Sequence, residues 1–202
     1  DEVKFEITKK IRGIQPKEEL TKMLENFKIS TEKEGKRVVF RSEYKGNIKN
    51  PSDKSVDLKV YVPKKVDSVD INLNVGTIKF FDDIRGVINL DVDSVNVDIN
   101  KLIGKIIMTA HMGNVRISEG RLESGSSVKT DFGNIIIKTE LEETGEYYFR
   151  TEVGSIDLSL PEDSEFDVEA KGSIRLNEFE QCFSGAKIKL ESKMGDINLT
   201  RY

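Results

Sequence analysis

The chain of 202 residues contains no tryptophan, one histidine (His111), one cysteine (Cys182) and four prolines. A single cysteine excludes an intramolecular disulfide, and one cysteine with one histidine excludes a zinc site built from these residue types. A Ser-His-Asp triad could use only His111. The longest apolar runs are a few residues, too short for a transmembrane helix. These shortages remove the commonest catalytic and metal-binding classes before any motif is considered.

Charge divides the chain into two parts. Residues 1–66 carry 17 Lys and Arg against 11 Asp and Glu, a net of +6, whereas residues 67–202 carry 15 against 25, a net of −10. The acidic part repels phosphates, so we expect no nucleic-acid partner. The basic part is either an ordinary solvated face or a segment that lies near an anionic membrane surface.

Residues 1–66 predict strands around one short helix. Apolar residues alternate with polar ones at 3–7, 38–40 and 56–62, which is typical of strands. Pro16 precedes apolar residues at helical spacing between Leu20 and Phe27, which predicts a helix over about 16–27. We expect this segment to be an α+β cap packed on one end of a repetitive domain formed by residues 67–202, because an open end exposes strand edges.

From residue 67 onward the chain repeats itself with a period near 20 residues. The repeat is marked by seven positions, six of them glycine, with apolar residues at two and four positions after each and alternating positions before it. The markers are Gly76, Asp93, Gly113, Gly133, Gly154, Gly172 and Gly195. The apolar residues after them are Ile78/Phe80, Val95/Val97, Val115/Ile117, Ile135/Ile137, Ile156/Leu158, Ile174/Leu176 and Ile197/Leu199. The residues directly before them, also expected to face inward, include Val75, Val92, Met112, Phe132, Val153 and Met194.

Each unit is therefore interpreted as a strand, a glycine corner and a second strand. Such a unit cannot bury its apolar face alone, whereas stacked units form one continuous core. We predict an all-β, single-stranded β-helix or solenoid of about seven rungs over residues 67–202. The row before Gly172 is one residue short, which predicts a bulge there. An antiparallel sandwich or barrel is the competing architecture, because many short strands with frequent turns also suit it.

A small polar residue follows every marker, and stacking would place these residues in one vertical ladder. They are Thr77, Ser94, Asn114, Asn134, Ser155, Ser173 and Asp196. We interpret the ladder as corner chemistry, in which short polar side chains bond to local backbone. A carbohydrate- or ion-binding stripe is the alternative.

The repeats resemble a known bacterial family. The stretches VGTIKF (75–80), MGNVRI (112–117), FGNIIIKTE (132–140), VGSIDLSLP (153–161) and MGDINLTRY (194–202) are similar to the adhesin-like family of unknown function with toast-rack β-solenoid repeats. The resemblance covers roughly residues 56–202. It implies a right-handed β-solenoid at the bacterial cell envelope, sometimes beside envelope-stress modules, with no catalytic residues to carry over.

The resemblance and the missing catalytic motifs predict a non-catalytic extracytoplasmic domain, an adhesin or an envelope-stress-associated binding scaffold, with no cofactor or metal. We expect an extracellular or cell-envelope location, membrane-anchored or secreted, and a start at Asp1 without Met suggests that a signal or anchor segment was left off. The expected partner is a protein or a cell-surface glycan. A purely structural spacer is a further possibility.

The main alternative is a β-helix carbohydrate-active enzyme, a polysaccharide lyase or hydrolase that uses surface carboxylates. Its candidate residues are Asp91 with Asp93, Asp82 with Asp83, and Asp157 with Asp196. We expect His111 to be exposed without a catalytic role, Cys182 to be an unreactive thiol, and the GSS stretch at 125–127 to be a turn.

Overall fold

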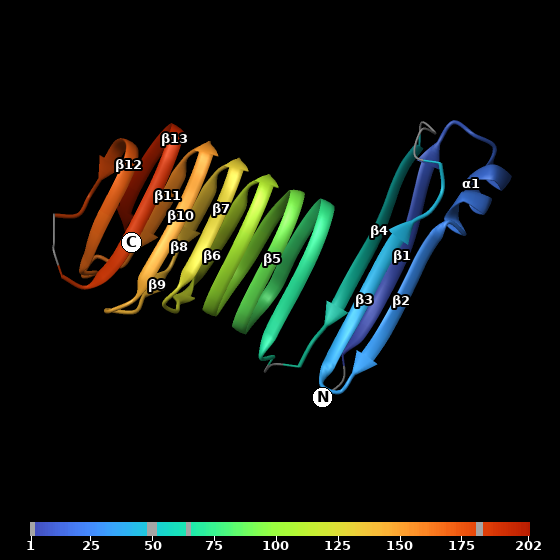
Figure 1. Cartoon of the computed structure of the whole chain (residues 1–202), viewed down its shortest axis with the longest axis horizontal. Helices are drawn as coiled ribbons and strands as arrows, with labels where there is room; N and C mark the ends of the chain where they lie inside the picture. Colours follow the sequence, from blue (N-terminus) through green and yellow to red (C-terminus); the bar gives the residue numbers. More distant parts are fainter. Residues whose placement is uncertain (1–2, 48–51, 64–65, 181–183) are drawn as a thin grey trace. The chain divides into compact units, whose positions relative to one another are not determined.

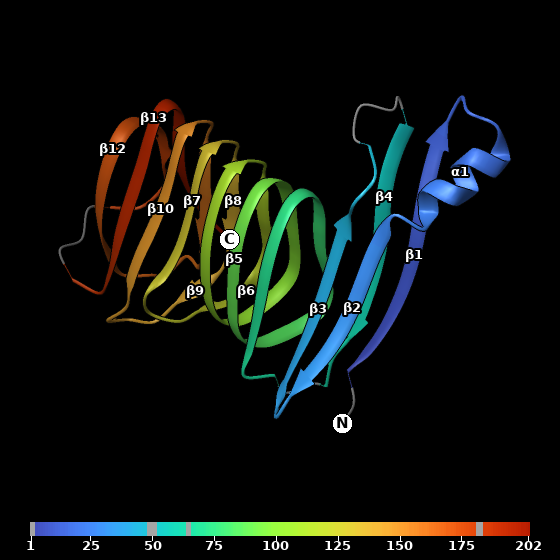
Figure 2. The same ribbon diagram turned by 45° about the vertical axis from the view of Figure 1, so that its right-hand side comes forward.

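The computed structural model describes residues 3–47, 52–63, 66–180 and 184–202 (Figures 1 and 2). The chain divides into two compact units at residue 63, close to the predicted boundary at 66. The expectation that the first unit caps the second stays a prediction.

The N-terminal unit consists of two antiparallel strand pairs and a helix. Strand β1 (Lys4–Gly13) pairs with β4 (Ser52–Tyr61), and β2 (Phe27–Glu34) pairs with β3 (Arg37–Tyr44). Helix α1 (Lys17–Leu24) begins directly after Pro16, whose fixed φ suits the first turn, as predicted. It ends before Phe27, which was expected in the helix. Phe27 instead begins β2 and lies buried with its ring edge-on to Tyr44, at a centroid distance of 4.9 Å.

The C-terminal unit is a β-solenoid, which confirms the predicted fold class. Its strands stack side by side, and all the strand pairings within it are parallel, so the sandwich or barrel alternative is wrong (Figure 1). The strands are β5 (Ser68–Met112), β6 (Val115–Leu122), β7 (Ser126–Phe132), β8 (Ile135–Lys138), β9 (Glu140–Leu141), β10 (Glu146–Val153), β11 (Ile156–Leu160), β12 (Phe166–Asn177) and β13 (Ala186–Arg201).

The coils make about five turns, fewer than the predicted seven rungs. The rows at the two ends of the stack are only partly buried, whereas the middle rows are complete. Ile135 and Ile137 of β8, for example, are almost fully buried, and so are Ile156 and Leu158 of β11. This continuous apolar interior, shared by neighbouring rungs, is what a repeat of this length requires.

The glycine corners exist because neighbouring rungs approach closely there. A Cβ atom on Gly133 would lie 1.9 Å from the carbonyl oxygen of Gly113, and one on Gly154 would lie 2.1 Å from that of Gly133. Hydroxyl side chains inside the corner bond to carbonyls of the same glycines. Thr151 donates to the Gly133 oxygen at 2.8 Å, and Ser192 donates to that of Gly154 at 2.9 Å. The corner is therefore a tight, hydrogen-bonded seam along the stack.

Two details of the predicted repeat are wrong. Pairing of Val97 with Val115 places Val95, not Asp93, at the corner beside Gly113, so this rung turns without glycine. The side chain directly before each glycine lies outside the solenoid, because the backbone already turns at the corner. These exposed residues are Val75, Met112, Phe132, Val153 and Met194.

The last two rungs do not follow the order of the sequence. Strand β13 pairs with β10 and β11 on one side and with β12 on the other, so β12 is the outermost strand of the stack (Figure 1). The C-terminal strand is thus inserted between two rungs that precede it in the chain. The pairing of β12 shifts register at Lys171/Ser173 and at Ile174/Leu176, which confirms the predicted bulge.

Candidate binding surface

One broad surface of the solenoid carries most of its organised polar side chains. We call it face A and define it as the outward side of the strand segments that precede each corner: 70–74, 89–93 and 107–111 in β5, then β7, β10, residues 187–193 of β13 and 167–171 of β12. Parallel pairing in register aligns equivalent residues in columns, as with Lys129, Arg150, Glu191 and Lys171. The core beneath holds these columns in place.

The N-terminal half of face A contains a shallow, open groove. Its outward lining combines acidic and amide side chains with one histidine and two cations, Lys129 and Arg150. The principal residues are Asn72, Asp91, Asp93, His111, Asp131 and Arg150. Neighbouring rungs are tied by amide–carboxylate contacts: Asn89 donates to Asp70 at 2.6 Å and Asn72 to Asp91 at 3.5 Å. Because planar polar groups repeat at the strand spacing of about 4.8 Å, the groove offers a regular row of donors and acceptors.

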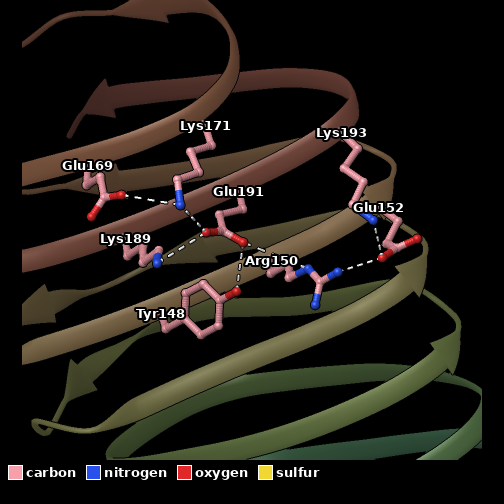
Figure 3. A network of polar contacts seen from close by, with 8 residues as sticks. All are labelled: Tyr148, Arg150, Glu152, Glu169, Lys171, Lys189, Glu191 and Lys193. Carbon is pink, nitrogen blue, oxygen red and sulfur yellow. Dashed lines mark hydrogen bonds and ion pairs between the residues drawn. The ribbon is translucent and has the colours of Figure 1, made fainter.

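The C-terminal half of face A carries a network of ion pairs centred on Glu191 (Figure 3). The Tyr148 hydroxyl donates to Glu191 at 2.8 Å, and the ammonium groups of Lys171 and Lys189 each lie 3.3 Å from the same carboxylate. The ring of Tyr148 lies between two ammonium groups, of Lys129 at 5.1 Å and Lys189 at 5.5 Å from its centroid.

A second carboxylate extends this network. The guanidinium of Arg150 lies 3.9 Å from Glu191 and 2.5 Å from Glu152, and Lys193 lies 2.6 Å from Glu152. Ion pairs therefore link three neighbouring strands, β10, β13 and β12, across the surface. Single exposed ion pairs contribute little to stability, but a connected set of this kind orders the side chains that form it.

These contacts change the acidity of the groups at the centre. The hydrogen bond from Tyr148, together with Lys171 and Lys189, lowers the pKa of Glu191 to about 2. The Glu191 side chain is only 19% exposed. Burial and the bond to Glu191 raise the pKa of the Tyr148 hydroxyl, and the bond to Glu191 raises that of Lys171. The Glu191 carboxylate therefore stays ionised, and Tyr148 and Lys171 stay protonated, at any physiological pH.

The middle of the predicted polar ladder, from Asn114 to Ser155, is present, and its side chains bond to backbone as the structural interpretation expects. Side-chain oxygens accept bonds from the backbone N–H of the next rung: Asn96 from Asn114 at 2.9 Å, Asn114 from Asn134 at 3.0 Å, and Asn134 from Ser155 at 2.8 Å. Asn96 occupies the place expected for Ser94, because the corner lies at Val95. The ladder thus satisfies backbone groups at the seam.

The structure places the other candidate residues in different surroundings. His111 is exposed, as expected, but Nδ1 lies 2.8 Å from Asp131 Oδ2, a partner that the spacing of the sequence did not indicate. Asp91 and Asp93 line the same groove. Asp157 instead accepts a bond from Asn198 at 2.6 Å, and Asp196 from Arg175 at 3.4 Å.

Three further candidates remain. Asp82 and Asp83 are exposed in β5, and neither lines the groove. Ser126, in the GSS stretch, is buried and donates to the Glu123 carbonyl at 2.7 Å, as a turn residue does. Cys182 lies outside the described residues.

The Glu191 network could not be found from spacing. Tyr148 and Glu191 are 43 residues apart, and they meet because β13 is inserted beside β10. A rung order read along the chain would place residues 166–171, not 187–193, beside β10. The one sequence signal is the irregular row before Gly172, which marks the place where the simple order ends.

Comparison with protein-family models, with curated proteins and with solved structures finds no match to the chain. Within the described residues no helix is long and apolar enough to cross a membrane. The same residues contain no group of three or more His, Cys, Asp and Glu side chains arranged to hold a metal ion.

Proposed function

We propose that this chain is a non-catalytic binding scaffold of a bacterial cell envelope, an adhesin-type or envelope-stress-associated domain that presents face A to a protein or a surface glycan. The observation that carries the proposal is the organised polar surface itself. A groove of amide and carboxylate groups continues into a network of ion pairs, on a rigid parallel core. Shallow, hydrogen-bonding surfaces of this kind suit extended polar partners. The resemblance of the repeats to envelope proteins supports the location.

The proposal is tested by binding to intact cells of the source bacterium. The purified chain is sedimented with the cells, and the bound fraction is compared with that of Asp91→Lys/Asp93→Lys, which reverses charge in the groove. Asp82→Lys/Asp83→Lys is the matched control, because it makes the same charge change at exposed positions outside the groove. We expect the groove variant to bind several-fold less and the control to bind normally. Equal loss in both, or no binding by the unaltered chain, contradicts the proposal.

Treatment of the cells distinguishes the class of partner. Protease treatment abolishes binding if the partner is a protein, whereas periodate oxidation abolishes it if the partner is a glycan. An antibody that labels the endogenous protein on intact cells tests the envelope location. Labelling only after lysis would contradict that location.

The alternative of a carbohydrate-active enzyme has one observation in its favour. Asp91 and Asp93 line the same groove as the His111–Asp131 pair. Carboxylate pairs of this kind serve glycosidases as acid, base or nucleophile. The enzyme hypothesis predicts that the chain releases reducing or unsaturated sugar ends from envelope polysaccharides, and that Asp91→Asn/Asp93→Asn abolishes the release.

A further inference from the structure

The outermost strand of the solenoid, β12, has the features of an unfinished edge. Within the described residues it pairs with β13 alone, whereas β10 and β11 each have a strand on both sides. An edge strand directs half of its N–H and C=O groups away from its neighbour, which leaves them available to another strand.

The core positions of β12 are also incompletely covered. Ile174 pairs with Ile197, as Ile156 does in β11, so it holds the inward position at which Ile156 is almost fully buried. In β12 this inward side chain is 48% exposed, and Leu176, which the second bulge places opposite Asn198, is 43% exposed beside it. The apolar interior of the solenoid therefore reaches the surface next to a strand edge. A further strand on this edge would pair the free N–H and C=O groups and cover the exposed apolar surface at the same time.

The charges along this edge are complementary to themselves. Glu169 and Lys171 lie on the same side of β12, with their charged groups 3.5 Å apart. In an antiparallel pair of two β12 strands, Glu169 of each copy can lie opposite Lys171 of the other. A two-fold axis repeats every contact, so this arrangement forms two attractive cross-strand pairs.

We propose that two copies of this chain associate end to end through β12, which pairs antiparallel with β12 of the second copy and joins the two solenoid cores. The association stops at two copies. Because a two-fold contact uses the same edge on both copies, neither copy retains a free β12 edge after pairing.

The experiment is sedimentation velocity of the whole chain over a wide range of concentration. We expect a reversible shift from 22.9 kDa to twice that mass. Ile174→Lys places a charge on the exposed apolar end and is expected to keep the chain monomeric throughout. Met112→Lys is the matched control, because Met112 is 44% exposed at a corner of β5, several strands from the β12 edge, and should leave the dimer intact. Thermal melts of both variants verify that they fold.

Variants that reverse the charge of Glu169 or Lys171 test the proposed pairing itself. Glu169→Lys and Lys171→Glu each place like charges opposite one another in a homodimer, so each variant alone should dimerise at least several-fold more weakly. A mixture of the two restores opposite charges at both pairs and should form a heterodimer. The proposal is overturned by a chain that is monomeric at every concentration, by a dimer that survives Ile174→Lys, or by variants whose mixture associates no better than each alone.

Discussion

Substitution of alanine for Gly133 tests the seam that joins the rungs. A Cβ at this position would lie 1.9 Å from the Gly113 carbonyl oxygen, whereas ordinary contacts begin at 3.4 Å, so the two rungs must separate by roughly 1.5 Å. The hydrogen bonds that join these rungs at the corner, Gly113 N–H to the Phe132 oxygen and Val115 N–H to the Asn134 oxygen, are each 2.9 Å long. Such a displacement breaks both.

Gly76→Ala is the matched control for this experiment. Its φ of 156° is nearly that of Gly133, 154°, so the backbone strain from a side chain is the same in both variants. A Cβ on Gly76 meets only the Leu73 side chain, at 3.2 Å, and that side chain can move. The two variants therefore differ in whether the added Cβ meets the backbone of a neighbouring rung.

The expected difference follows from the broken bonds. Each net hydrogen bond contributes about 1 kcal/mol, and the buried partners left unpaired cost more, so Gly133→Ala should reduce the free energy of unfolding by about 2–3 kcal/mol more than Gly76→Ala. Urea unfolding followed by far-ultraviolet circular dichroism measures both. Reductions that agree within about 0.5 kcal/mol would refute the close-packed seam.

Three further predictions concern the core, the network and the ladder. Ile135→Asp places an unpaired charge in the interior and should lower the free energy of unfolding, measured with heat or urea, by several kcal/mol. Ile136→Asp, at the half-exposed adjacent position, should lower it little. Equal effects of the two substitutions would contradict the inward assignment of the row. Because the pKa of Glu191 is about 2 in the folded chain and higher in the unfolded one, its contribution to stability is complete above about pH 4.5 and is lost as the pH falls towards 2. Glu191→Gln should flatten that part of the pH–stability curve, and Tyr148→Phe should raise the Glu191 pKa in a carbon-13 NMR titration; an unchanged curve or pKa would show that these contacts do not form. Asn134→Ala removes the acceptor for the Ser155 N–H and should destabilise the chain by about 1 kcal/mol, whereas Asn100→Ala, an exposed asparagine outside the ladder, should have no measurable effect.

The interior of the solenoid was predictable because burial there depends on local alternation. Ile135, Ile137, Ile156 and Leu158 face inward as the period of two requires. Alternation assumes a straight strand, however, and this is why Met112 and its equivalents were wrongly placed inside. At a corner the direction of a side chain depends on how the backbone turns, which spacing alone does not contain.

The contacts of the candidate surface were predictable only where they join rungs that are consecutive in the chain. The ladder of Asn114, Asn134 and Ser155 follows from consecutive rungs stacking in register. The Glu191 network depends instead on which rungs are neighbours at the end of the stack. That order is a property of the tertiary structure, and the alternation within each strand does not contain it.

The insertion of β13 beside β10 has a consequence for how the chain is synthesised. Residues 166–177 emerge from the ribosome before residues 186–201, yet their final partner is the later segment. The earlier rungs can add one after another as synthesis proceeds, but the end of the solenoid cannot. β12 either waits unpaired or first occupies the place that β13 takes later. In a chain that lacks residues 186–202, β12 has lost its partner strand, and the edge that β10 and β11 present to β13 is left open to it.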